Sequence, residues 1–124
     1  MNNEMIKKAE AAVDAKVPDA DKQAYDKIVL AGMKVMFQEG GPHAELVQGL
    51  KEAHDKVPAV VDGIIGILGM LFKQSRGSMP VAPMLLAGQS LLMEALDFME
   101  QGGMIEVTPE ILGEATRLYI EKIL

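Results

Sequence analysis

The chain has 124 residues, of which 49% are hydrophobic and 24% charged; this composition predicts one folded domain over residues 1–124 and excludes a disordered chain. The net charge of −6 and the scattered basic residues exclude a surface built for nucleic-acid phosphates, which needs clustered Lys and Arg. Cysteine is absent, which excludes disulfides and thiolate metal sites and fits a reducing compartment. The N-terminal residues alternate charge with alanine, and no secretory signal is visible.

Three helices are predicted in the N-terminal part of the chain. The first, over residues 3–16, carries a thin apolar stripe and ends before a proline. The second begins after the candidate N-caps Asp19 and Asp21 and runs to about Glu39, with an apolar arc wide enough to be buried on most sides. Two glycines end the second helix, and the third occupies residues 42–55.

The sequence "VPAVVDGIIGILGMLF" at residues 57–72 holds a single charge. We expect a helix over about 58–74, buried at the centre of the fold, because apolar side chains surround almost all of it. Gly63, Gly66 and Gly69 would each cost roughly 1 kcal/mol relative to alanine inside a helix. We therefore predict that this glycine stripe packs closely against another backbone, and that Gly66→Leu lowers the free energy of unfolding by more than about 2 kcal/mol.

Two other structures fit the same segment. The dipeptide Asp62-Gly63 between apolar runs is a β-hairpin signal, although a lone hairpin in a helical chain is only marginally stable. Residues 57–98 also have the outline of a membrane hairpin. Its first apolar run, however, is shorter than the roughly 20 residues that a span needs, and its second contains acidic side chains that are costly in lipid. The buried helix is preferred over both.

Two further helices complete the predicted fold. The fifth begins near Pro83 and ends at Gln101, before a pair of glycines. The sixth opens with Thr108 as N-cap, Pro109 at the first helical position and Glu110 in the first turn, and it runs to the last residues. The predicted fold class is therefore all-α, a compact bundle of five to six helices.

Side chains that could carry chemistry are few. His43 and His54, the only histidines, would lie some 16 Å apart along one continuous helix, too far apart for joint metal ligation. Glu94, Asp97 and Glu100 have the spacing of a solvated helix face. The sequence contains no nucleophile elbow, phosphate-binding loop, zinc-protease motif or dinucleotide fingerprint. We therefore expect no enzyme activity, no catalytic residue, no cofactor and no metal site.

Methionine is abundant, with ten residues in a chain that has no tryptophan. Methionine fills irregular cores, and it also covers surfaces that adapt to a partner. The last helix ends in apolar residues, Ile120, Ile123 and Leu124, where a free monomer would place charge. We predict that these three residues contact other protein subunits, in an oligomer or a larger assembly.

The sequence "ILGMLFKQSRGSMPVAPMLLAGQSLLMEALDFMEQGG", followed by "VTPEILGEATRLY", resembles small virion proteins encoded in the structural-gene blocks of tailed bacteriophages. The resemblance covers roughly residues 57–120 and lies in the overall pattern of small, acidic, Met- and Ala-rich helices. It implies a helix-packing component of the portal, tail or ejection apparatus, without catalytic residues and with other virion proteins as partners. It carries no site motif, so no functional residue is transferred by it.

The sequence thus predicts a non-enzymatic structural or assembly protein, located in the virion if the resemblance holds and otherwise in the cytoplasm. One alternative is a membrane-active helical hairpin, a lysis or ejection protein that uses residues 57–98. Another is a small bacterial adaptor or regulator. Direct nucleic-acid binding is not expected from the charge, and membrane contact is a property of the hairpin alternative only.

Overall fold

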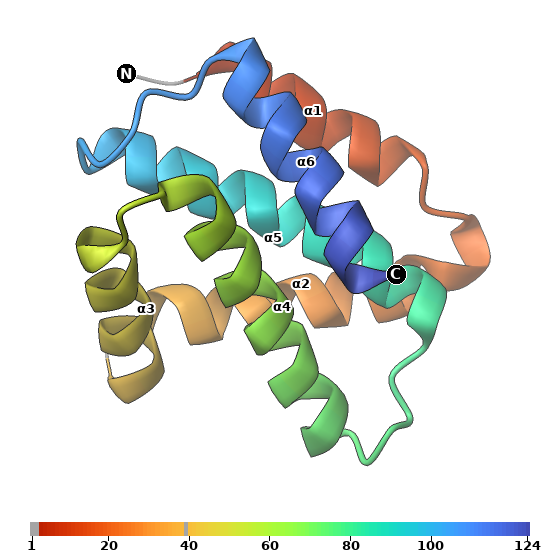
Figure 1. The fold of residues 1–124 in the computed structure, drawn as a ribbon. Helices are drawn as coiled ribbons and strands as arrows, with labels where there is room; N and C mark the ends of the chain where they lie inside the picture. Colours follow the sequence, from red (N-terminus) through yellow and green to blue (C-terminus); the bar gives the residue numbers. More distant parts are fainter. Residues whose placement is uncertain (1–2, 39) are drawn as a thin grey trace.

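The protein is an all-α bundle in the computed structural model, which describes residues 3–38 and 40–124 (Figure 1). No strand occurs in these residues, and Asp62 and Gly63 lie inside a helix, so the β-hairpin alternative is wrong. The six α-helices are α1 (Glu4–Ala15), α2 (Lys22–Phe37), α3 (Gly41–Glu52), α4 (Lys56–Gln74), α5 (Val81–Gln101) and α6 (Pro109–Ile123). The predicted end of the second helix, Glu39, lies outside the described residues.

Side chains cap three of the helices at the N-terminus. Thr108 accepts a hydrogen bond from the backbone N–H of Ile111 at 3.2 Å, which confirms the predicted start of α6. Asn3 caps α1 and Asp55 caps α4 in the same way. Of the two candidates for α2, Asp21 does occupy the N-cap position, but its side chain makes no capping bond, and Asp19 lies at the start of a short 3₁₀ turn over residues 19–21.

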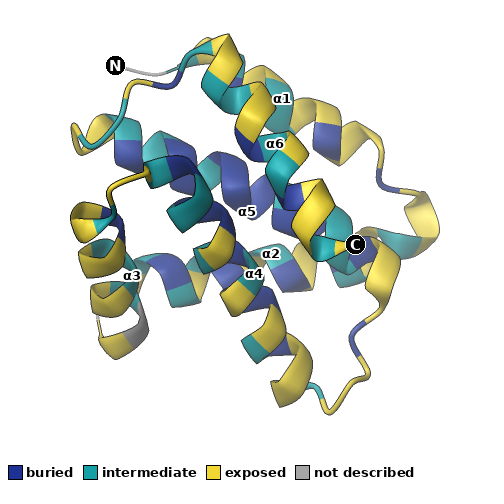
Figure 2. Ribbon diagram, viewed as in Figure 1, coloured by how far each residue is buried: buried dark blue, intermediate teal, exposed yellow. Residues whose placement is uncertain are grey.

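The centre of the bundle is α5. It packs against α1, α2, α4 and α6 and is buried over most of its circumference (Figure 2). The predicted central helix over about 58–74 corresponds to α4, which buries one face, including Val61, Ile64 and Leu68, and leaves the opposite stripe exposed. The central position therefore belongs to residues 81–101, while α4 covers one side of them.

Two glycines allow the closest helix contacts, and neither belongs to the predicted stripe. A Cβ at Gly32 on α2 would lie 2.4 Å from Leu91 Cδ1 on α5. A Cβ at Gly88 on α5 would lie 2.0 Å from the hydroxyl of Tyr119 on α6 and 2.6 Å from Leu68 Cδ1 on α4. A Cβ at either position would force a buried neighbouring side chain to move, which glycine avoids.

The predicted close packing along the α4 stripe is wrong for two of its three glycines. Gly66 and Gly69 are exposed, and a Cβ at either position would meet no atom within 4 Å. Gly63 does have a close neighbour, Leu46 Cδ1 at 2.8 Å, but this is the end of a side chain on α3 and not a backbone. The stripe faces outward because Asp62 shares it and is paired with Lys122 on α6 at the surface.

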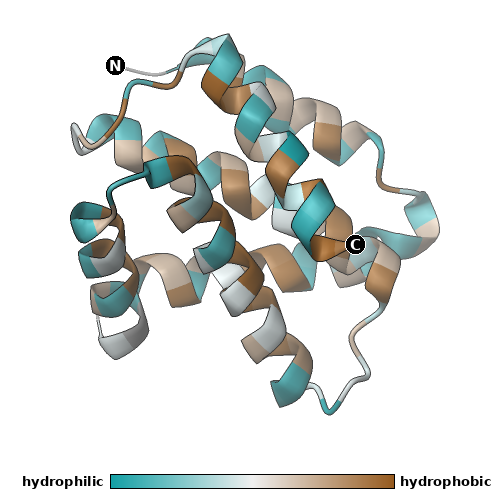
Figure 3. Cartoon of the chain, in the orientation of Figure 1, coloured by the Kyte–Doolittle hydropathy of each residue, from teal (hydrophilic) through white to brown (hydrophobic). Residues whose placement is uncertain are grey.

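Two described helices, α4 and α5, are long and apolar enough to span a membrane. Core helices of soluble bundles share this length and hydropathy, and the apolar faces of both helices are already covered by other helices here. The membrane hairpin alternative would therefore require the bundle to come apart. By contrast, Figure 3 shows hydrophilic residues along α3, where Leu50 is the one buried side chain among those that the structure describes.

A matched pair of substitutions tests the close contacts. Gly88→Ala should lower the free energy of unfolding by about 1–3 kcal/mol or more, because the added methyl group overlaps Tyr119. Gly66→Ala makes the same chemical change at an open position. It should raise the free energy of unfolding by up to about 1 kcal/mol through helix propensity. Urea unfolding of both variants measures the difference. Equal effects of the two substitutions would show that Tyr119 does not lie against Gly88.

Candidate functional site: an apolar groove between α1 and α6

An open groove of about 640 Å³ lies between α1 and α6. Its lining is mostly apolar and comes from both helices: Met5, Ala9, Pro109, Leu112, Gly113, Thr116, Arg117, Ile120 and Glu121. The two helices are far apart in the sequence and come side by side at the top of the bundle in Figure 1. Both helices pack on α5 and make little direct contact with each other. The groove is the space that stays open between them.

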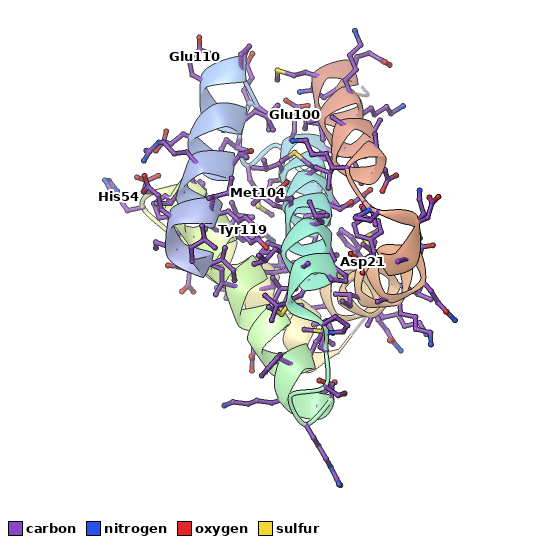
Figure 4. The ribbon with its side chains drawn as sticks, turned by 90° about the vertical axis from the view of Figure 1, so that its right-hand side faces the viewer. Asp21, His54, Glu100, Met104, Glu110 and Tyr119 are labelled. Carbon is purple, nitrogen blue, oxygen red and sulfur yellow. The ribbon has the colours of Figure 1, made fainter. Side chains whose placement is uncertain are left out.

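Helix α6 packs on α4 and α5, and Tyr119 anchors it to α5. This side chain is fully buried between α6 and α5 (Figure 4), and its hydroxyl donates a hydrogen bond to the carbonyl oxygen of Leu85 at 2.9 Å. Burial raises the pKa of Tyr119 well above its usual value, so the hydroxyl remains a donor. Near the end of the helix, Lys122 Nζ lies 2.7 Å from Asp62 Oδ1 on α4. These contacts attach one side of α6 to α5 and α4, so the opposite side of α6 faces the groove.

The three residues predicted to contact a partner are placed differently. Ile120 lines the groove and is 38% exposed. Leu124 is 86% exposed, at the end of the chain and away from the groove lining. Ile123 is half-buried and packs against the core. The structure thus brings only Ile120 into the groove, and the partner contact itself stays a prediction.

The sequence did not point to the α1 wall of the groove. Ile6 and Val13 of α1 are buried against the bundle, as the thin apolar stripe of residues 3–16 predicts. Ala9 belongs to the predicted stripe and Met5 lies beside it, and both are half-buried. The apolar character of these residues was visible in the sequence, but nothing there pairs helices separated by about ninety residues.

Charge is confined to the rim of the groove. Arg117 Nη1 and Glu121 Oε1 form an exposed ion pair at 2.8 Å, one helical turn apart on α6. Such a pair contributes little to stability because water screens it. The two charged groups of the lining therefore pair with each other, and the hydroxyl of Thr116 bonds to its own helix at the carbonyl oxygen of Leu112.

The acidic residues of α5 are not the solvated face that the spacing suggested. Glu94, Asp97 and Glu100 are all half-buried. Glu94 and Asp97 face Glu10 of α1, and the pKa of Glu10 is raised from 4.5 to about 8. The largest cause is burial, followed by a hydrogen bond with Glu94 and by repulsion from neighbouring carboxylates.

Glu100 ties the two sides of the groove together. Its carboxylate accepts a hydrogen bond from Asn3 Nδ2 at 3.1 Å, at the start of α1, and another from the backbone N–H of Val107 at 2.8 Å, just before α6. Figure 4 shows Glu100 at this end of the molecule. The carboxylate thereby fixes where the two walls of the groove begin.

The histidines do not form a site. A ring nitrogen of His43 contacts the carbonyl oxygen of Met36, and the ring meets the edge of Phe98 with centroids 6.2 Å apart. α3 ends at Glu52, so His54 is exposed beyond the helix and the two histidines do not share one, contrary to the sequence expectation. Within the described residues, no group of three His, Asp or Glu side chains is arranged to hold a metal ion.

No protein-family model, curated protein or solved structure matches the chain.

We expect zinc to bind no site of this protein tighter than about 10 μM, because one histidine is engaged by a backbone carbonyl and the other stands alone. Isothermal titration calorimetry with zinc, at a pH where histidine is neutral, makes the measurement. A one-to-one site with a dissociation constant below about 10 μM would contradict this expectation, because zinc would then have to be held by side chains that these contacts do not bring together.

Proposed function

We propose that this protein is a non-enzymatic assembly component whose α1–α6 groove packs against another protein subunit. The observation that carries the proposal is the apolar, open groove with Ile120 in its wall. Contiguous apolar surface on a small soluble protein is costly to leave in water, and its usual use is contact with a partner.

The lining favours a protein partner over a substrate. Small-molecule sites combine an apolar enclosure with a few polar groups that converge on the ligand. Here the groove is open, its rim charges Arg117 and Glu121 pair with each other, and Thr116 bonds within its helix. An apolar ridge of another subunit, such as one face of a helix, suits this surface because it needs no directed polar contact.

The resemblance to tailed-phage virion proteins supplies the specific form of the proposal. In that form the partners are other virion proteins of the portal, tail or ejection apparatus, and the protein resides in the particle. The groove is compatible with such a role because helix packing alone would hold the subunit in place. If the protein is not a virion component, we propose that the same surface binds a different partner in a cytoplasmic assembly.

A charge placed in the groove tests the proposal. Ile120→Glu should abolish self-association or incorporation into particles, because a carboxylate would have to leave water at the interface. Leu30→Glu is the matched control: Leu30 is 59% exposed on α2, outside the groove lining, and its replacement should have no effect on assembly. Sedimentation at high protein concentration and copurification with particles provide the readouts, and urea unfolding confirms that both variants fold.

A point substitution is preferred to removal of residues 120–124. Lys122 pairs with Asp62, and Ile123 packs against the core, so truncation would also loosen α6. The proposal fails if the intact protein is a clean 13.4 kDa monomer that copurifies with no particle or complex. It also fails if Ile120→Glu and Leu30→Glu assemble equally well.

A further inference from the structure

Helix α6 carries apolar side chains on two faces. One face is buried in the bundle through Ala115 and Tyr119. Another face carries Ile120 in the wall of the groove, and Leu124 follows four residues later, just beyond the last residue of the helix. Residues four apart lie on the same side of a helix, so these two exposed side chains form an apolar ridge on the outer face of α6.

The same outer face of α6 contains a hollow that such a ridge can fill. Gly113 lies two helical turns before Ile120 and also lines the groove. A Cβ at Gly113 would meet no atom within 4 Å. Pro109, one turn before Gly113, is exposed at the start of the helix and belongs to the same lining. One face therefore presents a ridge near the C-terminus of the helix and a hollow near its N-terminus.

A ridge and a hollow on one face fit each other when two copies of the helix run antiparallel. If Ile120 is set opposite Gly113 of the partner subunit, the antiparallel direction also sets Leu124 opposite Pro109 of the partner subunit. A two-fold axis makes each contact occur twice. Ile120 then packs on backbone that carries no side chain, which lets the two helices approach closely.

The charges beside this face are complementary in the same register. Arg117 and Glu114 are exposed, and being three residues apart they lie on one flank of the helix. A two-fold axis keeps the flanks of both copies on the same side, so Arg117 lies within one turn of Glu114 of the partner subunit. In the described part of the chain Glu114 belongs to neither ion pair. The guanidinium has five N–H donors, so it can bind this carboxylate while it keeps its bond to Glu121.

We propose that the partner in the α1–α6 groove is a second copy of this chain, in a two-fold symmetric dimer held by antiparallel α6 helices. This inference rests on the proposed function, because it names the occupant of the same groove. In the dimer, Ile120 and Leu124 leave water, and Met5 of α1 borders the incoming helix. A second copy suits the surface because it supplies the ridge, the hollow and the opposite charges in one register.

Sedimentation equilibrium of the isolated full chain tests the dimer. The parent chain should show a reversible equilibrium between monomer and dimer. Arg117→Glu and Glu114→Arg should each raise the dissociation constant by at least about tenfold, because each sets like charges opposite one another. An equimolar mixture of the two variants should dimerise as the parent chain does. In the mixed dimer, the glutamates of one variant face the arginines of the other.

A matched pair of glycine substitutions tests the hollow. Gly113→Leu fills it and should raise the dissociation constant by at least about tenfold, since Ile120 of the partner subunit no longer fits. Gly66→Leu is the control, because Gly66 is an equally open helical position on α4, outside the groove lining. It should leave the dissociation constant unchanged. Urea unfolding confirms that all variants fold.

The outcomes separate this inference from the proposed function. A parent chain that stays monomeric throughout the concentration range overturns the dimer. If that monomer still enters particles or a complex and Ile120→Glu prevents this, the proposed function stands without the dimer; if it enters none, both fail. The dimer is also overturned if Gly113→Leu and Gly66→Leu associate equally well, or if the mixture of charge variants associates no better than either variant alone. Restored association in the mixture supports it.

Discussion

Helix α5 can leave water only if other helices cover most of its circumference, because its apolar residues are not confined to one stripe. This requirement explains the architecture: α1, α2, α4 and α6 each cover part of the surface of α5. Two small positions set how closely they approach. Gly32 receives Leu91, and Gly88 receives Tyr119, so the crossings with α2 and α6 are close enough to exclude water from the core.

Most of the fold could be predicted from the sequence because its boundaries are local. Proline, paired glycines and the cap at Thr108 act within a few residues, and the helix limits follow them closely. The glycine contacts could not be predicted, since they depend on which distant side chain faces each glycine. Gly66 and Gly88 look alike in sequence, yet one faces solvent and the other meets Tyr119.

The candidate site was predictable only in part for the same reason. Ile120 stood out as an apolar residue near the end of a charged helix, and it does line the groove. The opposite wall arises because α1 and α6 both pack on α5 and come together at the same end of the bundle. Periodicity identifies the face of a helix that is buried, but it does not identify the helix that the face meets.

Amide hydrogen exchange measures most directly whether α5 is the core of the bundle. Amides in the middle of α5, around Leu91–Leu96, should exchange only through global unfolding, with a free energy equal to that from urea unfolding. Amides of α3, whose described side chains include one buried residue, Leu50, should exchange through much smaller local openings. Exchange in α5 as fast as in α3, or slower exchange in α4 than in α5, would contradict the central position of α5.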